Sequence, residues 1–100
     1  ISFFGEIDPT IYTNLSNLSK IIMKDDFLKD HIKYIYSDSL SFYLSVKRFN
    51  YNIELGSLEN ISEKLNNYKV FMASIMDDEI LNKYSHLNLK FNKQVIAQKK

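Results

Sequence analysis

Two histidines, His31 and His86, are the residues best suited to acid–base or metal chemistry in this sequence, which contains no cysteine. A catalytic or metal-binding histidine needs a second group held close to it. The two histidines lie far apart in the chain, and no HExxH or similar paired spacing occurs. His31 lies beside an apolar stripe, where a packed and hydrogen-bonded histidine is the commoner case. Without cysteine, disulfides, thiolate zinc sites and cysteine nucleophiles are excluded.

Acidic clusters at 25–26 and 77–79 are the next candidates for chemistry. They lack the alternating oxygen ligands and the central glycine of a calcium loop, and they suit helix N-termini instead. With Gly5 and Gly56 as its two glycines, the chain has no phosphate-binding loop, and it has neither a GxSxG nor a kinase signature. We therefore expect no catalytic residues, no metal, no cofactor and no enzyme activity.

Composition predicts one globular domain over residues 1–100. Hydrophobic residues make up 45% of the chain and aromatic residues 14%, which is enough for a core. The thirteen basic and twelve acidic residues give a net charge of +1, which argues against a nucleic-acid partner. No apolar run approaches the ~20 residues of a transmembrane segment. The chain begins with Ile rather than Met, so we expect an excerpt of a longer protein or a processed product.

Helical spacing of apolar residues begins after Asp8 and Pro9, a favourable helix start. The spacing of four, three and four predicts a helix over 9–23, with a stripe of Ile11, Leu15, Leu18 and Ile22. A second helix is expected from 25–26 to about Tyr36. A third would start at Ser37 or Asp38 and reach Asn50, with a stripe of Phe42, Val46 and Phe49.

The second half of the chain also favours helices. Residues 50–52 and Gly56 predict a loop, and a helix with Ser57 as N-cap candidate follows to residue 75, with apolar residues Leu58, Ile61, Leu65, Tyr68 and Met72. A short turn or helix is expected at 77–81. Alternation at 87–91 indicates one extended segment, and a last helix would start at Asn92. One extended segment makes no sheet, so the predicted class is an all-α, small antiparallel helical bundle.

The segment HIKYIYSDSLSFYLSVKRFN resembles the middle of a regulator of G-protein signalling (RGS) domain. The family's apolar-x-Phe-Trp helix signature is similar to Leu40-Ser41-Phe42-Tyr43, and its next core helix is similar to the stretch NYKVFM. Its later apolar-Asn-apolar loop is similar to Leu87-Asn88-Leu89. The similarity extends over about residues 28–96, and the chain ends before the family's C-terminal helices.

The RGS resemblance implies a non-enzymatic signalling module, or scaffold, that binds a Gα subunit and regulates its GTPase from loops at one end of a helical bundle. Carried onto this sequence, the partner-binding residues are Ser37, Asp38 and Ser39 in one loop, with Asn88 and Lys90 in another. Ser39 stands where the family has an asparagine, so the resemblance implies weak or lost GTPase acceleration. It also implies an intracellular protein, cytoplasmic or held at the inner membrane surface by its partner.

An alternative hypothesis is a structural helical domain, or a subunit of a larger assembly, with no G-protein partner. It predicts that Phe3, Phe4, Tyr12 and the 87–91 segment dock against another chain. The two hypotheses differ in geometry, because the RGS hypothesis places Asp38 and Asn88 together at one end of the bundle. It also places antiparallel helices at 37–50 and 58–75.

Overall fold

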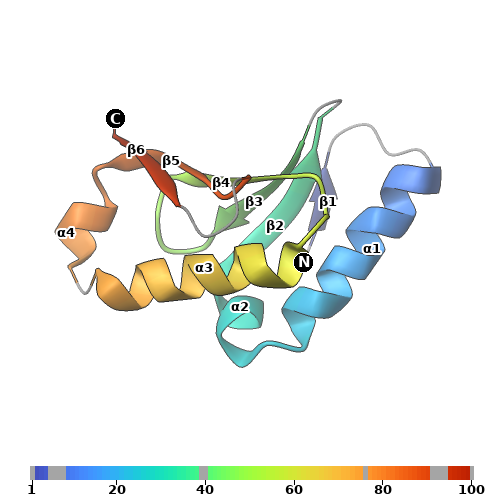
Figure 1. Ribbon diagram of the computed structural model, residues 1–100, viewed down its shortest axis with the longest axis horizontal. Coiled ribbons are helices and arrows are strands. Elements are labelled where there is room, and N and C mark those ends of the chain that lie inside the picture. The colour runs from blue at the N-terminus through green and yellow to red at the C-terminus, as the bar shows by residue number, and fades with distance from the viewer. Residues whose placement is uncertain (1, 5–8, 39–40, 76, 91–94, 100) are drawn as a thin grey trace.

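The protein folds as a mixed β-sheet with helices on one face (Figure 1). The computed structural model describes residues 2–4, 9–38, 41–75, 77–90 and 95–99. Within these ranges the strands are β1 (Ser2–Phe4), β2 (Ile32–Ser37), β3 (Phe42–Val46), β4 (Asn52–Gly56), β5 (Tyr84–Asn88) and β6 (Ile96–Lys99). The helices are α1 (Pro9–Met23), α2 (Asp26–His31), α3 (Ile61–Ser74) and α4 (Asp78–Leu81).

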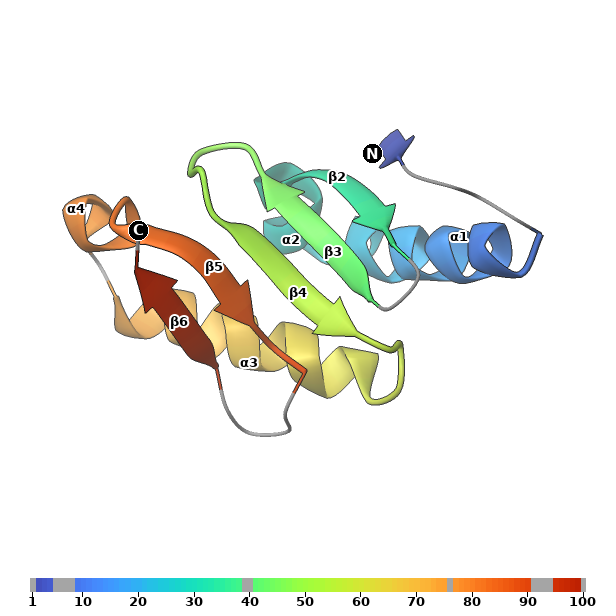
Figure 2. The ribbon, with the colours of Figure 1, turned by 90° about the horizontal axis from the view of Figure 1, so that it is seen from above.

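The strands lie in the sheet in the order in which they occur in the sequence. β1 and β2 pair in parallel and are joined through α1 and α2, and β4 and β5 pair in parallel and are joined through α3 and α4. The pairs β2–β3, β3–β4 and β5–β6 are antiparallel. Parallel neighbours need such long crossovers, and Figure 2 shows α1, α2 and α3 behind one face of the sheet. The opposite face carries no helix among the described elements.

The all-α class, and with it the predicted helix from 37–38 to 50, is wrong. Residues 42–46 form β3, in which Leu44 and Val46 are buried while Tyr43 and Ser45 are partly exposed. The misleading feature was the spacing of four between Phe42 and Val46, because four residues return to the same side of both a helix and a strand. Leu44 separates the two cases. It shares the buried face in a strand but would lie opposite that stripe on a helix.

Two further segments predicted as helical also contain strands. The helix expected from 25–26 begins as predicted, since Asp25 caps α2 by accepting from the backbone N–H groups of Phe27 and Leu28, both at 3.0 Å. It ends at His31, because the next residues, IKYIYS, are mostly β-branched or aromatic and form β2. The stretch assigned to a loop around Gly56 contains β4, and β6 replaces the helix expected after Asn92.

Several predicted elements are confirmed. α1 spans Pro9–Met23 as expected, and its buried residues are Leu15, Leu18 and Ile22. α4 lies within 77–81 and is capped by Asp77, whose side chain accepts from the N–H of Glu79. The extended segment expected at 87–91 is confirmed in part, because β5 begins earlier, at Tyr84, and ends at Asn88, while Phe91 lies outside the described residues. α3 starts at Ile61 rather than after Ser57.

The core lies between the sheet and the helices. It includes the fully buried side chains of Leu15 and Ile22 from α1, Ile35 and Leu44 from the sheet, and Tyr68 from α3.

Lys64, in the first turns of α3, is also buried. Its ammonium group donates to the carbonyls of Leu55 at 2.9 Å and Ser57 at 2.8 Å. Burial lowers the pKa of Lys64, and the two carbonyls satisfy most of its donors. This lysine therefore ties the start of α3 to the end of β4.

We expect Leu44→Ala to lower the free energy of unfolding by about 2–5 kcal/mol, because it leaves a cavity in the middle of the sheet. The matched control is Val70→Ala, since Val70 is 61% exposed on α3. It should change stability by less than about 0.5 kcal/mol. Urea denaturation of both variants measures the difference, and equal stabilities would contradict a buried position for Leu44.

Candidate functional site

The predicted loop residues at 37–39 lie at the turn between β2 and β3. Ser37 is the last residue of β2 and is buried, and Asp38 follows it. The Asp38 carboxylate accepts from the Ser41 backbone N–H at 2.9 Å and from the Tyr43 hydroxyl at 3.0 Å. Asp38 therefore closes a hairpin instead of capping a helix, while Ser39 lies outside the described residues.

Asn88 and Lys90 lie at the same end of the sheet as Asp38. Asn88 ends β5, and its side-chain oxygen accepts from the Lys90 backbone N–H at 2.9 Å. Both segments meet at Glu54 of β4, which accepts from the Ser41 hydroxyl at 3.0 Å and pairs with the Lys90 ammonium at 3.3 Å. The two predicted loops are thus at one end of the molecule, although that end belongs to a sheet and not to a helical bundle.

A row of hydrogen-bonded side chains crosses the helix-free face of the sheet. We call Tyr36, Asn52, His86 and Glu54 the polar row. The Asn52 amide donates to the Tyr36 hydroxyl at 3.1 Å, and the Asn52 oxygen lies 2.6 Å from His86 Nδ1. His86 Nε2 lies 3.0 Å from a Glu54 oxygen. Side chains of β2, β4 and β5 are therefore linked across the sheet.

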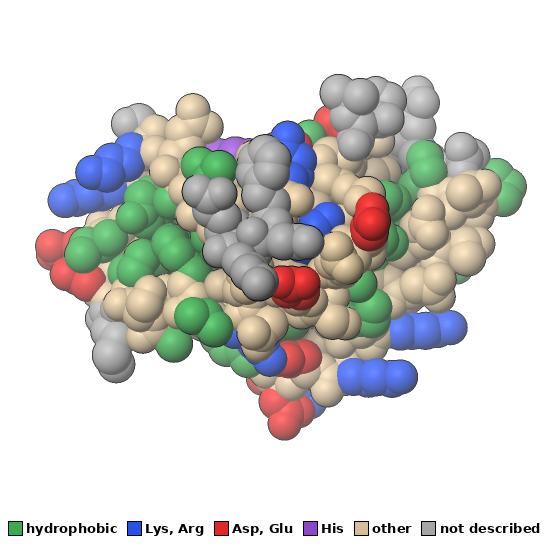
Figure 3. Space-filling model, in the orientation of Figure 1, with side chains coloured by type: hydrophobic (Ala, Val, Ile, Leu, Met, Phe, Trp, Pro, Cys, Tyr) green, Lys and Arg blue, Asp and Glu red, His purple; other side chains and the backbone are tan. Residues whose placement is uncertain are grey.

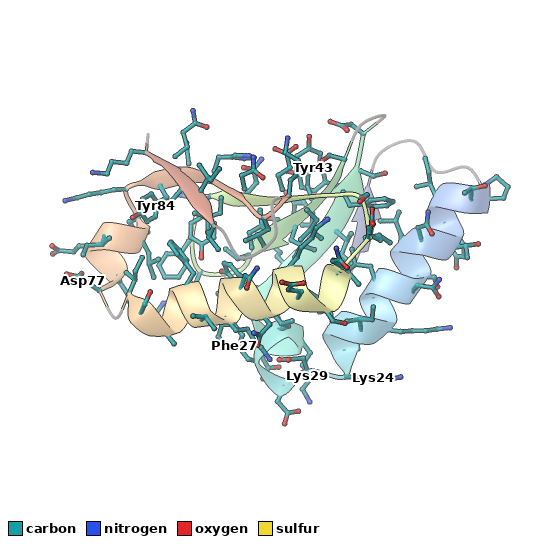
Figure 4. The ribbon with its side chains drawn as sticks, viewed as in Figure 1. Lys24, Phe27, Lys29, Tyr43, Asp77 and Tyr84 are labelled. Atoms are coloured by element: carbon teal, nitrogen blue, oxygen red, sulfur yellow. The ribbon has the colours of Figure 1, made fainter. Side chains whose placement is uncertain are left out.

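Tyr36 of the polar row also stacks on an aromatic side chain of β3. The rings of Tyr36 and Tyr43 stack with centroids 5.0 Å apart and an interplanar angle of 9°. In Figure 4 Tyr43 lies on the side of the sheet away from the helices. Burial and the hydrogen bond to Asp38 raise the pKa of Tyr43, so its hydroxyl stays protonated.

Glu54 is the charge centre of the polar row. Its side chain is 16% exposed, and this burial alone would raise its pKa. Hydrogen bonds from Ser41, His86 and Lys90 outweigh that effect and hold the pKa of Glu54 below its ordinary value. Glu54 is therefore an anion, and its carboxylate is hydrogen-bonded to Ser41, which precedes β3, to His86 of β5 and to Lys90, which follows β5.

The polar row is not arranged for hydrolysis. A serine nucleophile needs a histidine nitrogen as its base, whereas both ring nitrogens of His86 already face Asn52 and Glu54. Ser41 is bonded to the carboxylate and not to the imidazole. In the described part of the chain no three His, Asp or Glu side chains are grouped to hold a metal ion. The geometry supports a rigid, polar binding face.

Strand β6 is the outermost strand at this side of the described sheet. It pairs with β5, and its side chains at 96, 98 and 99 are exposed, with Ile96 42% exposed. Ala97 is half-buried against the core, so Ile96 and Gln98 point to the same face as the polar row. An outer strand offers unpaired backbone N–H and C=O groups, which can pair with another strand.

Residues 1–98 match the family model described as FtsQ/DivIB, C-terminal related. The chain belongs to this family. No functionally curated protein matches it. The RGS resemblance, the Gα partner and the role in GTPase signalling are therefore wrong. The aromatic positions that suggested helices of an RGS domain, Phe42 and Tyr43 among them, lie on a strand of this FtsQ/DivIB-related domain.

The docking residues of the assembly hypothesis are only partly available in this FtsQ/DivIB-related domain. Leu87 and Leu89 are buried in its own core, so they do not dock against another chain. Tyr12 is 55% exposed on α1, the side chains of Phe3 and Phe4 are not described, and Phe91 lies outside the described residues. Among the helices that can be examined, none is long and apolar enough to cross a membrane.

Sequence reasoning missed Asn52 and Glu54, the two members of the polar row on β4. The available signal was strict alternation, with apolar residues at Tyr51, Ile53 and Leu55 and polar residues between them. His86 was noticed, but its partners were hidden because pairing between β4 and β5 joins residues that are distant in sequence.

We expect Glu54→Gln to lower the free energy of unfolding by about 1–3 kcal/mol at pH 7, because it weakens charged hydrogen bonds in a partly buried site. Since the pKa of Glu54 is depressed in the folded state, its stabilisation is present above the ordinary value of 4.5 and is lost as the pH falls through the lower folded value. The stability difference between wild type and variant should therefore shrink toward about pH 3. Urea titrations measure this, with Glu59→Gln, an exposed carboxyl, as control. A difference that is constant with pH would contradict this role.

Proposed function

We propose that this chain is a protein-binding domain of the bacterial cell-division machinery, and that a partner protein adds an extended segment to the sheet beside β6. The family match supports the cell-division context. The exposed outer strand is the observation that carries the binding mode. An extended peptide at such an edge gains affinity from backbone hydrogen bonds and specificity from alternate side chains.

The sequence of β6 suits an added strand. Ile96 presents an apolar side chain next to the polar row, opposite Asn88 in the register of β5 and β6. A partner strand would place alternate side chains beside Ile96 and Gln98 on that face. On the other face its side chains would lie beside Ala97, which packs against the core. Apolar side chains on both faces of the partner strand would thus pack beside Ile96 on one face and Ala97 on the other.

The proposed domain acts without catalysis. His86 is engaged at both nitrogens, and Glu54 is held by Ser41 and Lys90, so neither group is poised for proton transfer. Asp38, Asn88 and Lys90 remain candidates as partner contacts, because they border the open face of the sheet. The Ser37 side chain is buried and does not reach that face. The intracellular location was inferred together with a Gα partner and stays an untested prediction.

Cysteine cross-linking tests the pairing directly, because the chain has no cysteine of its own. With Gln98→Cys in the chain and single cysteines along a segment of a co-expressed division protein, disulfides should form at alternate positions, as expected for paired strands. Val70→Cys on α3 is the control and should not cross-link. Uniform cross-linking at neighbouring positions, or none with any division protein, would overturn the proposed binding mode.

We expect Ile96→Lys to reduce partner binding at least about tenfold while the fold is kept, because it places a charge where the added strand would contact apolar surface. Calorimetry measures the affinity for the division protein that the cross-linking experiment identifies, and thermal unfolding checks the fold of the variant. Val70→Lys, also at an exposed apolar position, should bind like wild type. Wild-type affinity of Ile96→Lys would count against β6 as the binding edge.

A further inference from the structure

A surface hollow of about 420 Å³ lies on the helix side of the molecule, among α2, the loop after β3, the end of α3, and α4. Its apolar walls include Phe27, Phe49 and Met72, and its polar groups are His31, Arg48 and Asp78. Figure 3 shows apolar side chains gathered over α4 and the adjoining end of α3. Figure 4 shows Phe27 beneath α3. The hollow shares no residue with β6 or the polar row.

A chain of buried hydrogen bonds leads from this hollow into the core. His31 Nε2 lies 2.5 Å from the Tyr68 hydroxyl, and the Tyr68 hydroxyl lies 2.6 Å from the Tyr51 hydroxyl. The Tyr51 hydroxyl donates to Met72 Sδ at 3.5 Å. Burial raises the pKa of both tyrosines, so each hydroxyl keeps its single hydrogen.

The donor–acceptor direction of these hydrogen bonds determines which nitrogen of His31 carries hydrogen. A thioether sulfur can accept but cannot donate, so Tyr51 uses its hydrogen on Met72. Tyr51 then accepts from Tyr68, and Tyr68 accepts from His31 Nε2–H. In the neutral ring, His31 Nδ1 is therefore a hydrogen-bond acceptor. Nδ1 makes no hydrogen bond with the described residues, and it is not sealed within the core.

The other polar groups of the hollow are already paired. Arg48 and Asp78 form an ion pair at its rim, and the Arg48 guanidinium lies 5.6 Å from the centroid of the Phe49 ring. Burial and the charge of Arg48 lower the pKa of His31 from its ordinary 6.5, so the neutral ring predominates at neutral pH. The hollow thus offers aromatic and thioether walls with one unpaired acceptor.

We propose that this hollow binds the indole side chain of a tryptophan on a partner protein, with the indole N–H donating to His31 Nδ1. An indole is flat, apolar and a donor only, which matches these walls and this single acceptor. Phe27 is 42% exposed and stacks on His31 with ring centroids 4.8 Å apart, so it can cover one face of the guest. Tryptophan is also the residue type most typical of interface hot spots.

The proposed occupant is a tryptophan of a partner protein. Residues 1–100 contain no tryptophan, so neither they nor the same residues of a second copy can supply the indole. A phenylalanine or leucine would fill the walls but leave Nδ1 without a donor, which costs affinity when water is excluded. The proposal stands whether or not a strand is added at β6.

The test uses N-acetyl-L-tryptophanamide as the probe and its 1-methylindole counterpart as the matched control, which lacks the N–H donor. NMR titration should show saturable shifts of the Met72 methyl and His31 ring signals, with the 1-methyl compound at least about tenfold weaker. Because the chain has no tryptophan, probe fluorescence gives a second measurement of the same binding. Binding should also be lost as acidification protonates His31 Nδ1.

Two variants locate the site. Phe27→Ala removes an exposed wall and should weaken binding of the amide several-fold, whereas Val70→Ala should not change it. His31→Phe removes the acceptor and should abolish the difference between the two indoles, and thermal unfolding of this variant checks its fold. Equal affinity of the two indoles for wild type, shifts confined to other residues, or no saturable binding would overturn the proposal. Binding of free tryptophan but not of the blocked amide would overturn a protein partner and indicate a small-molecule site.

Discussion

Burial of only one face of the sheet is the constraint on which the rest of this structure depends. Ile35, Leu44 and Ile53 lie side by side on β2, β3 and β4 in the observed register, and all three are fully buried. A slip of one residue in any of these strands would turn its apolar side chains to solvent and its polar ones into the core. The one-sided helix layer therefore sets both the register and the composition of the open face.

The open face shows how polar groups on a solvated sheet can still be ordered. Tyr36, Asn52, His86 and Glu54 are hydrogen-bonded to one another across strands, and Glu54 also accepts from Ser41, which precedes β3. Such a network orients its members without burying an unpaired charge. It makes this face a fixed polar surface beside β6.

The helix side depends on one buried hub. Tyr68 of α3 bonds to His31, the last residue of α2, and to Tyr51, which precedes β4. Lys69, next to Tyr68, pairs with Asp25 at the start of α2 at 2.5 Å. These contacts hold α2 against α3. The hollow lined by His31 is thus walled by elements that several polar contacts keep in place.

The amino-acid sequence by itself determined the helices whose signals are local. Pro9 and the stripe of Leu15, Leu18 and Ile22 predicted α1, and Asp25 and Asp77 predicted two helix starts, because caps and helical spacing act within one or two turns. Only the tertiary structure decided that 32–37 and 42–46 are strands. The spacing of three between the buried Ile32 and Ile35 is that of a helix, and the strand accommodates it through a register shift between Ile32 and Tyr34.

The candidate site divides in the same way. Asp38, Asn88 and Lys90 were named from the sequence, but Glu54, which connects their two segments, was not. Its partner Ser41 directly precedes β3 and its partner His86 lies in β5, and pairing of β4 with β3 and β5 brings them together. Local sequence can specify a cap or a stripe because the interacting groups lie within a few residues. A site made from adjacent strands depends on long-range pairing, so only the folded sheet could define it.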